Sequence, residues 1–257
     1  SCCFDGGQVY HLNAYGVLVC LNAETGAKIW GVNLLARYEA KNITWGISES
    51  VLVHGDRVFA TPAGAKGLVV ALDKRTGEDV WATPAIEGEQ AAYAAPILVD
   101  EGNRKVLVNC ASAHTFGVDA ATGALLWSVP HVDEKNTVNV TPVLWDGRLI
   151  VNNTSRDYGA VYALEPKDNA MARAWLCELK IGHGGILCVD GRLYGASSKG
   201  KLNGWVSIDV RSGEIAAADA SGALSEGSAL FADGRLYLLT ARGLMTLQAI
   251  TSAGYGL

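Results

Sequence analysis

A short phrase that recurs along the chain constrains its fold more than any other feature. In residues 71–81 it reads ALDKRTGEDVW, in which an apolar strand ends at an Asp, turns through Thr-Gly and reaches a Trp four residues later. The phrase returns at residues 20–30 and 117–127 with the same offset. Weaker copies, which depart at the Gly or the Trp position, lie at 163–175 and 207–217. Repetition at this spacing indicates one supersecondary unit used many times.

A second turn signal alternates with the first. Asp-Gly pairs separate apolar runs at residues 5–6, 146–147, 190–191 and 233–234, and such pairs are a strong signal for tight hairpins. The two signals together divide the chain into six units of four short strands, one roughly every 40 to 50 residues. Helical periodicity is nearly absent, and residues 34–41 hold the one candidate turn of helix. The pattern predicts an all-β protein, a β-propeller of four-stranded antiparallel blades.

The fixed offset of the Trp suggests a packing role. A four-stranded sheet has two apolar faces and cannot hide both by itself, so each blade needs a neighbour on either side. A Trp offers a large flat surface and an N–H group that requires a partner. We therefore predict that one Trp per blade is a wedge between adjacent blades, at Trp30, Trp81, Trp127 and Trp175.

The charge and hydrophobicity of the chain argue against some classes of binding partner. The chain has 257 residues and a net charge of -5, and its 21 Lys and Arg are scattered rather than clustered. This argues against a nucleic-acid partner. The apolar stretches are short and interrupted by Gly, Asp or Asn, so no transmembrane segment is expected.

The phrase Ala-Leu-Asp-x-x-Thr-Gly-x-x-x-Trp resembles the repeat signature of the pyrroloquinoline-quinone (PQQ)-like propellers. That family includes quinoprotein alcohol dehydrogenases and the propeller lipoprotein of outer-membrane assembly. The resemblance covers essentially the whole chain and implies a fold more strongly than a function, because many members of the family bind no quinone. Family propellers usually have eight blades, whereas six repeats are visible here.

We accordingly expect a single PQQ-like propeller domain over residues 1–257, either a six-bladed ring or part of an eight-bladed one. In the second case, further blades of a longer chain would be partners of these six. The approximate blade repeats are 1–34, 50–84, 95–130, 141–179, 186–220 and 228–257.

Candidate functional residues lie in the loops that a propeller gathers on one face, where function concentrates. The richest loop is residues 37–49, which carries both signs of charge and an aromatic residue. These loops predict a funnel that could bind a polar ligand or a peptide; the alternative is a set of solvated loop residues and one Trp packed on the ring. The candidates are Trp45, Glu49, Tyr93, His114, His131, Arg156, Asp157, Tyr158 and His183.

The resemblance also implies a specific test for a quinone site. In PQQ dehydrogenases a disulfide between adjacent cysteines covers one face of the quinone, a calcium ion polarises its carbonyl and an Asp acts as base. Cys2 and Cys3 have the right adjacency, but their position in the chain departs from the family. No Glu/Asn calcium pair and no Asp base match the family motifs. The other four cysteines are interpreted as buried small hydrophobes.

Motifs of other enzyme classes are absent, including G-x-S-x-G, H-E-x-x-H and a phosphate-binding Gly loop. The sequence therefore favours a non-catalytic binding or scaffold propeller with a protein or small polar ligand as partner, no catalytic residue, no metal and no cofactor. The alternatives are a PQQ- and calcium-dependent dehydrogenase and a carbohydrate-binding or small-ligand-binding propeller. The family resemblance implies a periplasmic or secreted bacterial protein.

Overall fold

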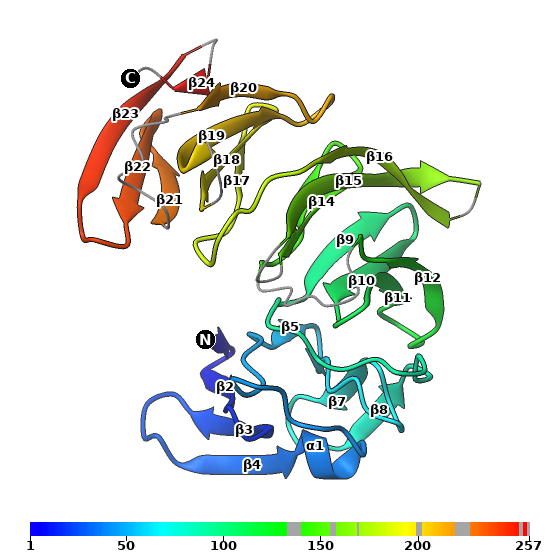
Figure 1. The fold of residues 1–257 in the computed structure, drawn as a ribbon. Coiled ribbons are helices and arrows are strands. Elements are labelled where there is room, and N and C mark those ends of the chain that lie inside the picture. The colour runs from blue at the N-terminus through cyan, green and yellow to red at the C-terminus, as the bar shows by residue number, and fades with distance from the viewer. Residues whose placement is uncertain are drawn as a thin grey trace. The chain divides into compact units, whose positions relative to one another are not determined.

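The computed structural model is all-β, as expected, with six four-stranded antiparallel sheets and one short helix among the residues it describes (Figure 1). In each sheet the strands follow one another in chain order, so every sheet is a meander. The described residues are 1–132, 140–154, 158–168, 170–198, 202–218, 227–251 and 254–255. The chain divides into two compact units, Ser1–Pro142 and Val143–Leu257, which are taken in turn.

The first unit holds three sheets, drawn from blue to green in Figure 1. The first sheet consists of β1 (Cys2–Asp5), β2 (Gln8–Leu12), β3 (Val17–Asn22) and β4 (Lys28–Asn33). The second consists of β5 (Leu52–His54), β6 (Arg57–Ala60), β7 (Val70–Asp73) and β8 (Asp79–Ala82). The third consists of β9 (Ile97–Glu101), β10 (Arg104–Cys110), β11 (His114–Asp119) and β12 (Leu125–Pro130).

The second unit holds the other three sheets. The fourth consists of β13 (Val143–Trp145), β14 (Arg148–Thr154), β15 (Gly159–Lys167) and β16 (Ala170–Cys177). The fifth consists of β17 (Leu187–Val189), β18 (Arg192–Ser197), β19 (Gly204–Asp209) and β20 (Ile215–Ala218). The sixth consists of β21 (Gly227–Ala232), β22 (Arg235–Thr240), β23 (Met245–Thr251) and β24 (Gly254–Tyr255).

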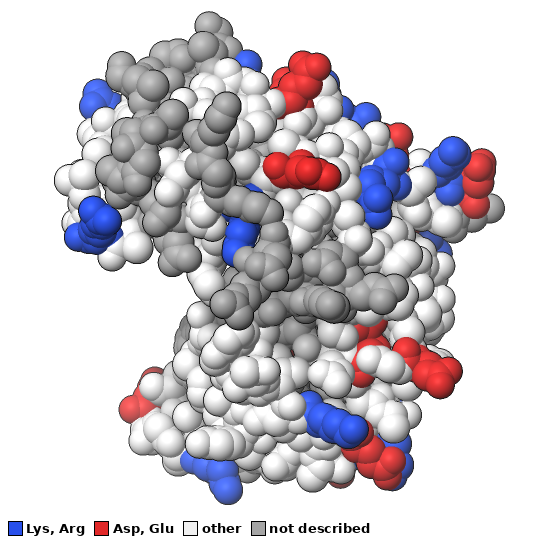
Figure 2. Space-filling model, viewed as in Figure 1, with Lys and Arg blue, Asp and Glu red and all other residues white. Residues whose placement is uncertain are grey.

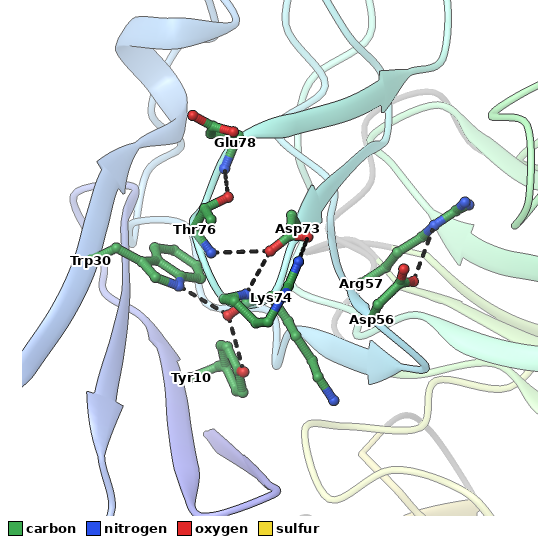
Figure 3. Close-up of polar contacts among 9 residues, drawn as sticks. Tyr10, Trp30, Asp56, Arg57, Asp73, Lys74, Thr76 and Glu78 are labelled. Carbon is green, nitrogen blue, oxygen red and sulfur yellow. Dashed lines mark hydrogen bonds and ion pairs between the residues drawn. The ribbon is translucent and has the colours of Figure 1, made fainter.

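The recurring phrase forms the turn between the third and fourth strands of a sheet. In the second sheet, Asp73 Oδ1 accepts hydrogen bonds from the backbone N–H groups of Arg75 (2.8 Å) and Thr76 (3.1 Å), and Thr76 Oγ1 accepts one from the N–H of Glu78 (Figure 3). These bonds hold the carboxylate form, and the N–H of Arg75 is the main cause of the lowered pKa of Asp73. Gly77 closes the turn at φ +73°, a conformation that Gly adopts without strain.

The Trp of each full phrase projects from the fourth strand beside a β-bulge. In the second sheet Ala71 pairs with Trp81 and the register shifts at the next residue; the first and third sheets have the same arrangement. Trp175 lies two residues later in its phrase, yet it takes the equivalent register opposite Ala163. The two additional residues lie in the hairpin itself, because β15 and β16 stay paired as far as Lys167 and Ala170, and an even number of added residues keeps the indole on the same face of the sheet.

Three of these indoles pack on the turn glycine of the following sheet. A Cβ placed on Gly77 would lie 2.7 Å from Trp30 Cε3, one on Gly123 would lie 2.6 Å from Trp81 Cε3, and one on Gly213 would lie 2.5 Å from Trp175 Cε3. Trp127 differs among the described contacts, since its indole packs on Gly117 of its own sheet. A side chain at the turn would therefore displace the ring in the first three cases.

The single described helix, α1 (Leu34–Arg37), is shorter than the predicted turn of helix over residues 34–41. Asn33 caps it, and its Oδ1 accepts a 3.0 Å hydrogen bond from the N–H of Ala36. No helix in the described part of the chain is long and apolar enough to cross a membrane. Figure 2 shows Lys and Arg interspersed with Asp and Glu on the viewed face, without a single basic patch.

Candidate functional site

Glu49 is the most deeply buried of the predicted site residues. It precedes β5 and is 2% exposed. Its carboxylate accepts hydrogen bonds from the backbone N–H of Thr61, just after β6, and from Asn109 Nδ2 on β10 at 3.3 Å. Asn109 Nδ2 also donates to Thr61 Oγ1 at 2.8 Å. The cluster thus ties the second sheet to the third.

Burial governs the charge of this group. Removal from water disfavours the carboxylate and raises the pKa of Glu49 to about 7, although the hydrogen bonds from Thr61 and Asn109 act in the opposite direction. At neutral pH the carboxyl group is therefore close to half protonated. A group of this kind can take up or release a proton, but a role in catalysis also requires access to a substrate.

The same cluster brings a Glu and an Asn together, which is the pair of donors that a calcium site in a PQQ dehydrogenase would use. The orientation does not fit a cation. Asn109 turns its amide nitrogen toward Glu49, while its oxygen accepts a hydrogen bond from the N–H of Cys110 at 2.8 Å. No group of three or more His, Cys, Asp or Glu side chains suited to a metal occurs among the described residues.

The adjacent cysteines do not form the quinone-covering pair that the resemblance implies. Cys2 and Cys3 both have free thiols on β1, an edge strand whose side chains alternate between its two faces. Cys3 packs against the core of the first unit, whereas Cys2 is exposed, with its Sγ 3.5 Å from His11 Nδ1 on β2. A quinone could not lie against both sulfur atoms in this arrangement.

His114 and His131 take part in hydrogen bonds that hold a loop. The carboxylate of Glu89 is 1% exposed and accepts hydrogen bonds from Ser112 Oγ (2.6 Å), the N–H of Ala113 (2.6 Å) and His114 Nδ1 (2.7 Å). His131 Nε2 donates to the carbonyl of Ala111 at 3.1 Å. Together these bonds fix residues 111–113, the connection between β10 and β11.

Burial lowers the pKa of His131 to about 4, so its ring is neutral at physiological pH. Ser112, Glu89 and His114 contain the residue types of a catalytic triad in the wrong order. The Ser112 hydroxyl donates to the carboxylate of Glu89 and not to a His, so the three residues do not form the Ser–His–carboxylate relay of a triad.

Among the predicted site residues of the first unit, Trp45 is the one that is exposed to solvent. Its side chain is 72% exposed, and its ring lies 5.8 Å from that of Tyr93 with an interplanar angle of 50°. The backbone N–H of Trp45 donates to Tyr93 Oη at 3.3 Å. Tyr15, on the turn between β2 and β3, is 76% exposed. Trp45 and Tyr93 therefore make a tilted aromatic pair with one open indole face.

The loop beneath Trp45 is well fixed. Asn42 Oδ1 accepts from the N–H groups of Ile43 (2.9 Å) and Ile47 (3.2 Å), and Asn42 Nδ2 donates to the carbonyl of Ala14 at 2.9 Å. Gly46 has φ +80°, and an added Cβ would lie 2.7 Å from the Ala14 oxygen. The indole is thus carried by a loop with little freedom to rearrange, a favourable property for recognition.

The remaining predicted residues are placed elsewhere. Tyr158 and His183 belong to the second unit, where Tyr158 is partly exposed and His183 is exposed between Gly182 and Gly184. Arg156 and Asp157 lie outside the described residues. The site that can be built from contacts is therefore in the first unit.

Sequence reasoning missed three residues on which the site depends: Thr61, Glu89 and Asn109. Asn109 left the clearest signal, because it interrupts the apolar run VLVNC of a buried strand and a buried amide must find partners. Glu89 and Thr61 left none, since their partners come from other segments of the chain.

The structure has six four-stranded meanders, and in three of them a turn glycine receives the indole of the preceding sheet. This arrangement defines a β-propeller of PQQ-like repeats. A family model described as outer membrane protein assembly factor BamB matches residues 2–219. The chain belongs to this family.

Relatives and solved structures fall in two groups. Quinoprotein ethanol dehydrogenase of Pseudomonas aeruginosa is 30% identical over 139 residues, covering 49% of this chain and 22% of that protein. Outer membrane protein assembly factor BamB of Kangiella koreensis is 27% identical over 157 residues, covering 61% and 34%. The chain thus spans between about a fifth and a third of the length of these two curated relatives.

Among solved structures, BamB from Moraxella catarrhalis has a TM-score of 0.65 at 18% identity, covering 97% of this chain and 80% of that one. Quinohemoprotein alcohol dehydrogenase from Pseudomonas putida HK5 also has a TM-score of 0.65, at 14% identity, covering 98% and 52%. At such identities the similarity establishes the fold and leaves the function open.

Proposed function

We propose that this chain is a non-catalytic binding propeller that holds a protein partner on the loop face around Trp45. The observation that supports the proposal most directly is the open face of the Trp45 indole, carried on Tyr93 by a fixed loop. Aromatic side chains that are both rigid and exposed are typical centres of protein interfaces.

The polar residues near this face support binding over catalysis. These residues form hydrogen bonds within the protein, which suits a structural role; they are Glu49, Glu89, His114 and His131. The BamB relatives are by name assembly factors of the outer membrane, which favours a protein partner and a periplasmic location in a bacterium.

The test is crosslinking of the purified chain to extract from the source cell envelope, with Trp45→Ala as the variant. We expect wild type to give a defined crosslinked species that Trp45→Ala loses, with an unchanged melting temperature because the side chain is exposed. Leu125→Ala, which truncates another exposed apolar residue on β12, is the matched control and should keep the species. Equal crosslinking by wild type and Trp45→Ala contradicts the proposal.

A carbohydrate or another small ligand is a second candidate, favoured by the same exposed indole, since sugars stack on such faces. It predicts a rise in melting temperature on addition of the right ligand, which Trp45→Ala abolishes. Wild type that shows a ligand-dependent shift but no protein crosslink would select this candidate.

The quinone-dependent alternative rests on the dehydrogenase relatives. Addition of PQQ and calcium, followed by a scan for the quinone spectrum and for alcohol-dependent dye reduction, decides it. We expect neither signal, because Cys2, Cys3, Glu49 and Asn109 are not arranged to hold the group.

A further inference from the structure

A cavity of about 520 Å³ opens between hairpin turns of the fourth and fifth sheets, within the second unit. It lies at the β13–β14 and β15–β16 turns of the fourth sheet and at the β19–β20 turn of the fifth. A volume of this size is typical of clefts that bind small ligands or a few side chains. Its aromatic and charged lining residues are Trp145, Asp146, Arg148, Glu165 and Arg211.

Trp145 and Arg211 form one wall of the cavity. Trp145 ends β13, and its ring packs over the β17–β18 turn of the fifth sheet, where a Cβ placed on Gly191 would lie 3.3 Å from Trp145 Cζ2. The guanidinium carbon of Arg211 lies 5.0 Å from the centroid of the same ring. The indole therefore holds the guanidinium in place by a cation–π contact between the two sheets.

The guanidinium of Arg211 has no carboxylate partner among the described residues. The backbone N–H of Arg211 donates to Asp209 Oδ1 at 2.9 Å, but the only contact of its side chain within that part of the chain is the Trp145 ring. A guanidinium carries five N–H donors in a planar fork that matches a carboxylate. Because stacking already restricts this fork, a carboxylate that binds it costs less entropy than at a free arginine.

The other arginine of the cavity is neutralised within its own sheet. Arg148 Nε donates to Glu165 Oε2 at 3.0 Å, and both residues belong to the fourth sheet. The net charge of the lining is therefore zero, since Asp146 and Glu165 balance Arg148 and Arg211. A polyanion would meet two carboxylates here, whereas a single carboxylate can pair with Arg211 alone.

The corresponding cavity between the second and third sheets, of about 430 Å³, lacks a stacked arginine. Ala121 takes the turn position there that Arg211 takes in the fifth sheet, as the hydrogen bond of each backbone N–H to the preceding Asp shows. Arg57 donates instead to the carbonyls of Ala120 and Ala121. The unpaired guanidinium is thus specific to the cavity between the fourth and fifth sheets and is not required by the repeat.

We propose that this cavity binds a peptide segment through one acidic side chain. The carboxylate of a Glu or Asp accepts paired, charge-assisted hydrogen bonds from Arg211, and an apolar neighbour in the peptide packs on Trp145. Asp146, Pro166 and Arg211 are exposed, so the rim admits a chain that continues past the site. The site belongs to the second unit and does not depend on the proposed function of Trp45.

The probes are two acetylated and amidated peptides, Gly-Phe-Glu-Ala-Gly and the same sequence with Gln in place of Glu. Isothermal titration calorimetry measures their binding to the intact 257-residue chain. We expect the Glu peptide to bind at least about tenfold more tightly, because only the carboxylate makes charge-assisted hydrogen bonds to Arg211.

Protein variants locate the binding. Arg211→Gln, at an exposed position, should weaken the Glu peptide about tenfold with an unchanged melting temperature. Arg211→Lys keeps the charge but loses the planar fork, and should weaken it about threefold or more. Arg173→Gln is the matched control, since Arg173 lies 5.2 Å from the Tyr162 ring centroid in the same unit but does not line the cavity. It should leave binding unchanged.

The proposal is overturned if wild type binds neither peptide, if it binds both equally, or if Arg211→Gln binds the Glu peptide as wild type does. Two competitors test the occupant. Sodium acetate that displaces the Glu peptide at equal concentration would show a site for small acids. An oligoglutamate that binds more tightly than the Glu peptide would show a general anion site, contrary to the balanced charge of the lining. We expect neither result.

Discussion

The indole Nε1 of Trp30 donates a 2.9 Å hydrogen bond to the carbonyl oxygen of Lys74, which also accepts a hydrogen bond from Tyr10 Oη at 3.1 Å (Figure 3). One backbone oxygen of the second sheet thus anchors two aromatic side chains of the first. Their rings lie 6.1 Å apart, so stacking and hydrogen bonding act on the same contact.

Trp81 occupies the equivalent position one sheet later without this bond. Arg57 Nη1 donates to the carbonyls of Ala120 and Ala121, each at 2.8 Å, and Trp81 Nε1 is buried with no partner among the described residues. We expect Trp30→Phe to lower the free energy of unfolding more than Trp81→Phe, by about 1 to 3 kcal/mol, since only the first loses a hydrogen bond. Urea unfolding of both variants measures the difference, and an equal cost contradicts it.

Glu49 should make stability depend on pH. Its pKa rises from 4.5 to about 7 on folding, so its contribution is complete below pH 4.5 and is lost as the pH rises through 7. The loss amounts to about 3 kcal/mol over this window. Glu49→Gln should flatten this part of the profile. Urea unfolding between pH 4.5 and 8 checks it, and a variant profile parallel to that of wild type would refute the assignment.

His131 should act with the opposite sign. Its pKa falls from 6.5 to about 4 on folding, so its contribution is present above pH 6.5 and is lost as the pH falls through 4. The expected loss is again about 3 kcal/mol. His131→Gln keeps a donor for the carbonyl of Ala111 and should be less sensitive to acid than wild type. In wild type the pH dependences caused by Glu49 and His131 have opposite signs and partly cancel. Each contribution is therefore measured as the free energy of unfolding of wild type minus that of the variant at each pH.

Gly46→Ala tests the loop that carries Trp45. The added methyl group would lie 2.7 Å from the Ala14 oxygen, and the backbone is already at φ +80°. Gly102→Ala is the control, because it has φ +60° but nothing within 4 Å and so meets only the cost of the backbone conformation. We expect Gly46→Ala to cost about 2 kcal/mol more, measured by thermal or urea unfolding. Equal costs would mean that the loop can move away from Ala14.

The fold could be predicted because its signals are local. Asn22, Asp73, Asp119 and Asp209 each cap a turn two and three residues ahead of themselves, so a fixed phrase of sequence is enough to reveal them. Trp175, which follows a longer hairpin, shows the limit of this approach. The sequence offset differs there, but the register in the sheet is the same.

The site could be predicted only in outline, because its contacts are not local. Glu49 meets Asn109 from 60 positions away, and His114 meets Glu89 from 25. Nothing in the loop around Glu49 distinguishes a buried carboxyl group from a solvated one. Trp45 was found because an exposed aromatic residue in a long polar loop stands out by itself.

Contacts between neighbouring sheets have a direction, because the Trp of one sheet packs on the turn glycine of the next sheet along the chain. Trp175 of the fourth sheet packs on the Gly213 turn of the fifth, but the fifth carries Ala217 at the equivalent position. The fifth sheet instead meets the sixth through Trp205 on β19, which packs beside Gly227 at the start of β21 rather than on a turn glycine. In a repeat protein, the stability of each repeat depends mainly on its contacts with the repeats next to it. The amide hydrogens of β21 and β22 should therefore exchange with solvent faster than those of β18 and β19. Local unfolding of this unit would then start at the contact between the fifth and sixth sheets.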